Sequence, residues 1–164
     1  MNTMVLAVFV SRGISDSPSS CEALALADPN PAPLKLHVDV GNGATYIVPT
    51  LKGSVLAGGV QRLDYGGKLL TKLLIQSVSL RQIKLNDYYL TAEHAKEEMC
   101  YVSQNFKEEL NNKDPLVEYY ALPDTDIKKS GFKTRVRDES NFQQYIQLAH
   151  ERFSIPEHLF NPGL

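Results

Sequence analysis

The sequence predicts an α/β domain, and three observations support this class. Residues 37–49 alternate apolar and polar side chains on either side of Asn42-Gly43, a dipeptide typical of two-residue β-hairpin turns. Residues 69–78 instead repeat apolar side chains with the 3.6-residue period of an α-helix. Residues 116–122 and 145–149 return to β-prone runs, so strand and helix patterns follow one another along the chain.

The composition is that of an ordinary globular protein. The chain has 164 residues, enough for one domain with a buried core, and a net charge of −2. This near-neutral balance excludes a nucleic-acid-binding surface that covers the whole protein. Cys21 and Cys100 lie far apart and form no CxxC pair, which is typical of a protein from a reducing compartment.

The N-terminal segment differs from the rest of the chain. Residues 1–10 are apolar but too short to span a bilayer, and they lack a positively charged flank, so we expect no membrane segment. Residues 11–33 are rich in Ser, Pro, Ala and Asp and show no period. We therefore interpret residues 11–33 as a linker or disordered tail. Residues 1–33 are expected to be either disordered or unrelated to the domain, which residues 34–164 form.

The hairpin is followed by a strand and two helices. We expect Pro49 to end the second hairpin strand, because proline cannot donate to a ladder. Residues 60–65 resemble a strand, and Gly66-Gly67 opens the first helix. A second helix is predicted to begin at an N-cap Thr91 and to continue to Leu110, because apolar residues recur at helical steps.

The C-terminal part contains further strands and a short helix. Residues 116–122 are predicted to pair with a return strand within residues 127–136, and residues 145–149 form the last strand. Residues 150–160 are predicted to be helical, with an interruption near Pro156 because proline lacks the N–H that continues a helix.

The hairpin turn has two interpretations. Asp39 ends the first strand, and Gly41 and Gly43 let a backbone approach a ligand closely. The turn is then either a plain hairpin or a site that aims N–H groups at a phosphate, with the Asp39 carboxylate reaching Mg²⁺ through water. The P-loop fingerprint is excluded, because it requires Ser or Thr at the position of Leu69. The Rossmann fingerprint is excluded, because it requires a third glycine at the position of Tyr46.

No catalytic set emerges from the sequence. The histidines lack metal-ligand spacing, the chain has no nucleophile elbow, and Cys100 is predicted to lie in mid-helix without a base. We therefore predict neither a catalytic residue nor a metal site, and expect that the protein is not an enzyme.

Two charged groups also have alternative interpretations. Lys96 and Glu97 are either solvated helix charges or ligand contacts. A basic cluster is either a solvated strand edge or a contact to histone acids or nucleic acid. The cluster consists of Lys128, Lys129, Lys133, Arg135 and Arg137.

Four stretches resemble the middle of actin-family proteins: VDVGNGATYIVP, RLDYGGKLLTKLL, AKEEMCYVSQNF and ERFSIPEHLFNP. The resemblance covers residues 34–162 and implies a partial α/β fold of the actin, Hsp70 and hexokinase type, which is ribonuclease H-like. The resemblance implies that the chain contains only the second half of that ATPase fold, and that this half is incomplete. Residues 1–33 do not resemble the family, so the resemblance implies a product truncated at both ends.

The resemblance also implies a nucleotide site. Asp39 would face Mg²⁺ through water, Gly67 would approach the nucleotide, and Lys96 and Glu97 would flank its ribose and base. Backbone groups would face the phosphates at Gly41, Asn42, Gly43 and Ala44. ATP with Mg²⁺ is expected in a full-length form, whereas tight binding is not expected here, because the other half of the cleft is missing from the sequence.

The family pattern is broken near the expected phosphates. Val40 replaces a small polar residue of the family, and Asn42 replaces an acidic residue. Tyr46 replaces the histidine that lies near the attacking water in actin. Water activation depends on positioned groups, so their loss argues against fast hydrolysis.

Three details resemble a nuclear branch of actin-related proteins: GGKLLT, SLRQ and IKKSGF. The resemblance implies a non-catalytic subunit of a chromatin-remodelling complex that exchanges a histone variant into nucleosomes. Its partners would be the complex scaffold and other subunits, with a histone contact through the basic cluster. It would be located in the nucleus and also in the cytoplasm. The alternative is an actin-like ATP-binding protein with weak or no ATPase activity.

Overall fold

The structure is a computed structural model that describes residues 5–9, 33–112, 116–123, 131–137 and 144–163, with the backbone alone for residues 5–9. The chain divides into two compact units, Met1–Leu69 and Leu70–Leu164, here called the N-terminal and C-terminal units. Within the described ranges, no helix has both the length and the apolar character needed to cross a membrane.

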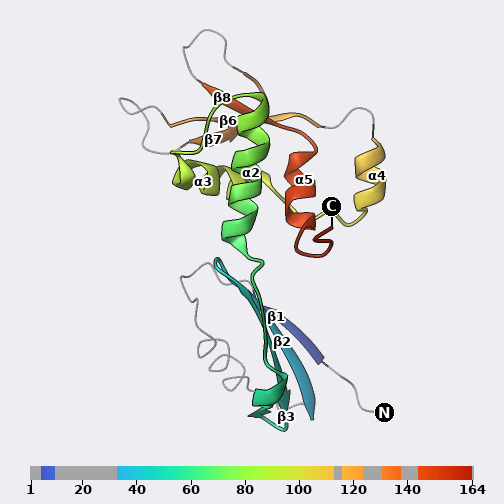
Figure 1. Ribbon diagram of the computed structural model, residues 1–164. Coiled ribbons are helices and arrows are strands. Elements are labelled where there is room, and N and C mark those ends of the chain that lie inside the picture. Colours follow the sequence, from blue (N-terminus) through green and yellow to red (C-terminus); the bar gives the residue numbers. More distant parts are fainter. Residues whose placement is uncertain (1–4, 10–32, 113–115, 124–130, 138–143, 164) are drawn as a thin grey trace. The chain divides into compact units, whose positions relative to one another are not determined.

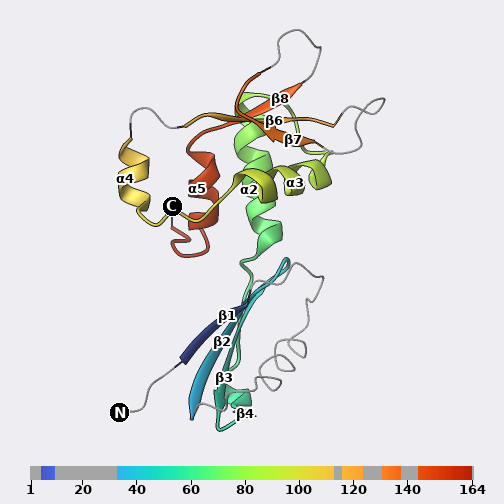
Figure 2. The same ribbon diagram turned by 180° about the vertical axis from the view of Figure 1, so that it is seen from behind.

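The N-terminal unit is built on one sheet with the strand order β1-β2-β3-β4, and β5 also pairs with β3. Figures 1 and 2 show β1, β2 and β3 side by side. β1 and β2 are parallel, whereas the other pairs are antiparallel. The bounds are β1 (Val5–Phe9), β2 (Leu34–Val40), β3 (Thr45–Leu51), β4 (Ser54–Val55), a 3₁₀ turn η1 (Ala57–Gly59) and β5 (Gln61–Leu63).

β1 belongs to the N-terminal segment. Val5–Phe9 is a strand whose residues pair with Lys35 to Asp39 of β2, so disorder, one of the two alternatives for residues 1–33, does not hold for these five residues. An apolar run too short for a bilayer is long enough for a strand. Residues 10–32 lie outside the described residues, and the domain boundary at residue 34 stays a prediction.

The buried face of β2 carries its polar side chains. Lys35, His37 and Asp39 are all buried, whereas Leu36 and Val38 on the opposite face are half-buried. His37 Nε2 lies 3.2 Å from the Thr50 hydroxyl of β3, within hydrogen-bonding distance. The period of two is therefore present as predicted, and the buried His37 ring has the Thr50 hydroxyl as a partner through Nε2.

The hairpin predicted at residues 37–49 is confirmed, but its turn differs. β2 and β3 are joined by Gly41–Ala44, where the Gly41 N–H donates to the Ala44 carbonyl at 3.0 Å. Among the described residues, positive φ occurs at Lys52 (48°) and Gly53 (80°), between the paired residues Leu51 and Ser54. The two-residue turn of the type expected at Asn42-Gly43 thus joins β3 to β4 instead.

Pro49 does not end its strand, contrary to expectation. β3 continues to Leu51, and Pro49 pairs in register with Leu36. Proline loses its N–H donor but keeps its carbonyl acceptor, and the Pro49 carbonyl accepts the Leu56 N–H at 3.0 Å. The bond network of β3 therefore continues past the proline.

The C-terminal unit holds most of the helices and a second sheet with the order β7-β6-β8, all antiparallel. The helix predicted after Gly66-Gly67, the strand pair and the last strand are confirmed, although each strand is shorter than expected. The bounds are α2 (Gly67–Arg81), α3 (Tyr89–Met99), α4 (Phe106–Asn111), β6 (Glu118–Ala121), β7 (Phe132–Thr134), β8 (Tyr145–Leu148) and α5 (Glu151–Glu157).

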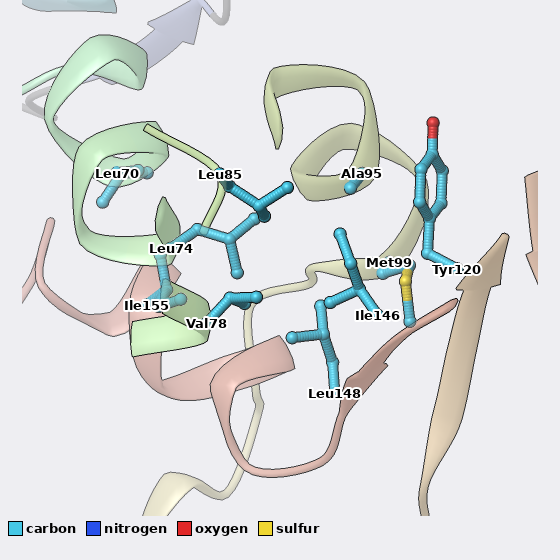
Figure 3. Packing of buried hydrophobic residues seen from close by; sticks show 10 residues of the cluster. All are labelled: Leu70, Leu74, Val78, Leu85, Ala95, Met99, Tyr120, Ile146, Leu148 and Ile155. Atoms are coloured by element: carbon cyan, nitrogen blue, oxygen red, sulfur yellow. The ribbon is translucent and has the colours of Figure 1, made fainter. Parts of the chain in front are cut away.

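The core of the C-terminal unit lies between α2, α3 and this sheet. Leu74 and Val78 of α2 point toward Ile146 and Leu148 of β8 (Figure 3). Met99 of α3 and Tyr120 of β6 complete the same cluster, and these side chains are at most 1% exposed. The helical period predicted for α2 therefore identified its buried face correctly.

The second predicted helix is two helices. It begins at Tyr89 rather than at an N-cap Thr91, and it ends at Met99 because Cys100 has an extended backbone with ψ 149°. Val102 and Leu110, predicted to be buried, are 54% and 45% exposed.

A tertiary hydrogen bond explains the break. The Tyr101 N–H donates to the Arg152 carbonyl at 2.9 Å. In a regular helix that carbonyl would accept from residue 156, which is a proline without an N–H. The helix α5 includes Pro156 and ends one residue later, at Glu157, so the helix predicted over residues 150–160 does stop near the proline. Tyr101 satisfies the carbonyl that the proline leaves without a donor.

Candidate functional site

The candidate phosphate turn, Gly41–Ala44, is bound to the start of α2. The Gly67 N–H donates to the Gly41 carbonyl at 3.1 Å, and the Lys68 N–H donates to the Asn42 carbonyl at 2.8 Å. The first N–H groups of a helix have no partner within the helix. Here the turn supplies two of those partners, so it satisfies the N–H groups of Gly67 and Lys68 within the N-terminal unit.

Gly66 makes this arrangement possible. A Cβ at position 66 would lie 2.7 Å from both the Gly41 and the Asn42 carbonyl oxygens and 3.1 Å from the Ala44 nitrogen. Any side chain would therefore push the backbone apart. The Thr45 hydroxyl also donates to the Tyr65 carbonyl at 2.6 Å, a second link between the same segments.

The geometry of the turn sets the direction of its N–H groups. Because a trans peptide holds its C=O and N–H on opposite sides, the N–H groups of Asn42 and Gly43 point away from α2. Asp39, 1% exposed, stands at the end of β2 in register with Tyr46. The structure thus brings Asp39, the turn and Gly67 together in the N-terminal unit, and their role in nucleotide binding stays a prediction.

Tyr46 has a packing role in this unit. It is 4% exposed and forms a small buried cluster with Ala44 and Val48. Where the family resemblance implies a histidine near an attacking water, this chain thus has an aromatic core residue.

Lys96 and Glu97 belong to the C-terminal unit, on α3. Lys96 Nζ donates to the Thr71 hydroxyl at 2.9 Å, a contact between α3 and α2. Glu97 is exposed. Neither compact unit alone contains all eight predicted site residues, and the role of these two in nucleotide binding stays a prediction.

The basic cluster has internal partners. Lys133 Nζ lies 2.6 Å from Glu118 Oε2, and Arg135 Nε lies 3.7 Å from Glu118 Oε1. Glu118 is 1% exposed, so these cations compensate a buried carboxylate. Arg137 is exposed. Lys128 and Lys129 lie outside the described residues.

Arg152 is the third and most buried cation at Glu118. Its Nη2 lies 2.9 Å from Glu118 Oε2, its Nε donates to the Met99 carbonyl at 3.2 Å, and its Nη1 donates to the Leu116 carbonyl at 3.3 Å. The guanidinium also lies over the Tyr101 ring, 5.2 Å from the centroid. Sequence reasoning missed this network, because a lone Glu in a strand and a lone Arg in a helix resemble solvated charges.

Cys100 is not a nucleophile in this structure. Burial raises its pKa to about 11, although Lys96 and Arg152 act in the opposite direction. The neutral thiol reacts poorly, since the thiolate is the nucleophile. Cys100 follows the end of α3 rather than lying in mid-helix. In the part of the chain that the structure describes, no group of three or more His, Cys, Asp or Glu residues could hold a metal ion.

Comparison with known proteins decides the family. The Actin family model matches residues 23–94 and 89–164, which together are most of the chain. The chain belongs to the actin family. The match begins within the segment that was expected to lie outside the family.

Several relatives are named as actin-like or actin-related proteins with the number 6. The chain is 38% identical over 134 residues to "Actin-like protein ARP6" of Yarrowia lipolytica, which covers 79% of this chain and 34% of that protein. It is 34% identical to "Actin-related protein 6" of Drosophila melanogaster, over 77% of this chain and 34% of that protein. It is 33% identical to "Actin-like protein ARP6" of Saccharomyces cerevisiae, over 79% of this chain and 31% of that protein.

The chain therefore spans about a third of the length of the curated relatives it matches. The helices, the sheets and the family match together confirm a partial α/β fold of the actin type. The resemblance to actin-related proteins is likewise confirmed.

Proposed function

We propose that this chain is a non-catalytic actin-related subunit of a nuclear chromatin-remodelling complex that exchanges a histone variant, and that it acts in assembly and partner docking. One observation carries the proposal: relatives named actin-related protein 6 match about 80% of the chain. Its proposed partners are the scaffold and other subunits of the complex. Its proposed location is the nucleus, with the cytoplasm in addition.

The chemistry of the C-terminal unit supports a binding role. Its most buried ionic groups, Glu118 and Arg152, hold structural elements together, and its Cys100 thiol is protonated at neutral pH. None of these groups is arranged to activate a substrate. The proposed histone contact then rests on the outward-facing part of the basic cluster, where Arg135 remains 78% exposed beside Glu118.

Co-purification tests this proposal. The native protein, at whatever length the cell makes it, is tagged and isolated from a nuclear extract under low salt. We expect remodelling-complex subunits in near-stoichiometric amounts. Their complete absence, with the tagged protein intact and soluble, would contradict a subunit role.

A second candidate function is ATP binding with weak or no ATPase activity, and the Gly66 geometry favours it. The close approach of Gly66 fixes a turn whose N–H groups at Asn42 and Gly43 share one side, an arrangement that suits phosphate oxygens. Mg²⁺ would neutralise phosphate charge, with Asp39 holding it through water. Lys96 and Glu97 would contact the ribose and base.

Titration with Mg·ATP tests the nucleotide proposal. We expect weak binding that falls in Asp39→Ala. Equal affinity of the two proteins would remove Asp39 from the site, and hydrolysis at rates typical of efficient enzymes would contradict the low-ATPase proposal.

A further inference from the structure

The two edges of the second sheet are closed to different degrees. β6 lies between β7 and β8, so β7 and β8 are the edge strands (Figures 1 and 2). On the outer edge of β8, the Gln82 amide donates to the Gln147 carbonyl at 2.7 Å and accepts the Gln147 N–H at 2.8 Å. A side chain thus satisfies the backbone of Gln147 as a neighbouring strand would.

The alternation of an antiparallel ladder shows which backbone groups of β7 face outward. Because Gln147 directs its N–H and C=O away from β6, the opposite residue Tyr119 directs its own groups toward β7. The next residue, Tyr120, then directs its groups toward β8. Lys133 of β7 lies opposite Tyr120, so the N–H and C=O of Lys133 point away from the sheet.

A backbone bond just beyond β6 confirms this direction. The Leu122 N–H donates to the Gln144 carbonyl at 2.9 Å, so Leu122 faces the β8 side. Backbone directions repeat every two residues along a strand, and Tyr120 must therefore face the same side.

The outward groups of Lys133 are open. In the ranges that the structure describes, neither its N–H nor its C=O has a hydrogen-bond partner. Lys133 is exposed as a residue although its side chain is only 34% exposed, so its backbone shares the exposure. The helix α3 packs against a face of the sheet, where Ala95 and Met99 join the cluster of Tyr120. The edge of β7 can therefore pair with a further strand.

The charge beside this edge is positive. The Glu118 carboxylate is paired with three cations: Lys133 at 2.6 Å, Arg152 at 2.9 Å and Arg135 at 3.7 Å. One carboxylate cannot neutralise three cations, so the group keeps a net positive charge. Arg137 is exposed, forms no ion pair within the described part of the chain, and adds to this charge.

Arg135 is the cation most accessible to a ligand. Its side chain is 78% exposed, whereas the Glu118 side chain is 2% exposed. Its contact to Glu118 uses Nε, so among the described residues Nη1 and Nη2 have no partner. Together these two nitrogens can bind one carboxylate with two hydrogen bonds.

We propose that the outer edge of β7 binds an extended, acidic segment of a partner protein as an added strand. Backbone bonds at Lys133 set the register of the segment. β7 is three residues long, so its edge offers few backbone bonds, and carboxylates on Arg135 and Arg137 supply most of the affinity. The inference deepens the proposed docking role and rests on it.

Two other occupants fit this edge less well. A second copy of the chain would bring the same cations against Lys133 and Arg135, which would repel it. A nucleic acid would meet the charges, but it has no N–H and C=O groups at the spacing of a strand edge.

Fluorescence anisotropy with two labelled peptides tests the edge in the intact chain. The first peptide alternates Glu and Val. The second has the same sequence with methylated backbone nitrogens, which keeps the charges and removes the donors. We expect the methylated peptide to bind about tenfold more weakly, as for lost hydrogen bonds.

A pair of variants tests the charge. Arg135→Gln should weaken binding of the first peptide about fivefold. The matched control is Arg62→Gln, which should leave binding unchanged. Arg62 is 60% exposed and paired with Asp64 at 3.1 Å, but it lies in the N-terminal unit.

Three outcomes would overturn the proposal. Equal binding of the two peptides would identify a surface that recognises negative charge alone, as a nucleic-acid contact would. Equal weakening in Arg62→Gln and Arg135→Gln would show that the charge has no fixed site. Absence of binding by either peptide would show that the edge is closed.

Amide hydrogen exchange provides a second readout that needs no variant. The Lys133 amide should exchange fast in the free chain and slowly with the first peptide bound. The Thr134 amide faces β6 and should change little. A Lys133 amide that stays unprotected while the peptide is bound would reject the edge as its site.

These tests use the purified chain and peptides. Their failure would leave the co-purification experiment unaffected, so the β7 edge and the subunit role can be rejected separately.

Discussion

The turn of the N-terminal unit and the ionic network of the C-terminal unit are built in opposite ways. The turn at Gly41–Ala44 is held by backbone hydrogen bonds from Gly67 and Lys68 and by the absence of a side chain at Gly66. The network depends on the side chains of Glu118 and Arg152. A site built from backbone groups should tolerate most changes of its own side chains, but not an added side chain at the close approach of Gly66. A network of charges should not tolerate the loss of either charged partner.

The largest effect is expected at the network. Arg152→Ala would leave Glu118 buried with weaker compensation and would remove three contacts that join α3, β6 and α5. We expect a loss of about 3–5 kcal/mol in the free energy of unfolding, measured by urea denaturation. The control is Arg62→Ala, whose exposed ion pair should change the free energy by less than about 1 kcal/mol. Similar losses in both variants would refute the role of burial.

A smaller effect is expected at the turn. Gly66→Ala places a Cβ 2.7 Å from two carbonyl oxygens, and relieving this overlap should cost about 1–3 kcal/mol. Gly58→Ala is the matched control, because a Cβ there meets nothing within 4 Å. Thermal unfolding of the two variants measures the difference. If Gly66→Ala were as stable as Gly58→Ala, the close approach would not constrain the turn.

The Cys100 thiol supplies a test by pH. Burial raises the pKa of the folded Cys100 thiol to about 11, above the usual value for cysteine, so the folded state keeps its proton where the unfolded state loses it. The contribution to stability is therefore present below pH 9 and is lost as the pH rises toward 11. Near pH 9, iodoacetamide should label Cys100 slowly in the folded protein and rapidly in urea. Equal labelling rates would contradict burial of the thiol.

The smallest effects are expected on α3. Lys96→Met removes the hydrogen bond to Thr71 and should cost about 1 kcal/mol. Glu97→Gln changes an exposed side chain and should stay within about 0.5 kcal/mol. Urea denaturation of the two variants separates them, and a larger loss in Glu97→Gln would show that Glu97 has a structural partner.

The sequence predicted elements whose local pattern and tertiary environment agree. The predictions from the α2 period and from the hairpin pattern are confirmed, because Leu74 and Val78 face a core and β2 pairs with β3 in register. The break after Met99 was not predictable locally, since it depends on a bond between Tyr101 and Arg152. Nothing near either residue in the sequence indicates that contact.

The candidate site shows the same division. Asp39 and Gly41 could be singled out from the sequence, because a glycine-rich turn after a strand is a local pattern, whereas Gly67 was assigned from the family resemblance. Gly66 was noted only as the start of a helix, and its contact with the Asn42 carbonyl comes from the fold. The ion pair between Arg81 and Glu151 was missed for the same reason, because the two residues are distant in sequence.

Residue-resolved hydrogen exchange on Gly66→Ala and Arg152→Ala tests the contrast between the two sites most directly. We expect faster exchange of the Gly67 and Lys68 amides in Gly66→Ala, with the Tyr101 amide unchanged. Arg152→Ala should accelerate Tyr101 and spare the turn. Acceleration of all three amides in both variants would contradict the claim that the two sites are held by separate networks.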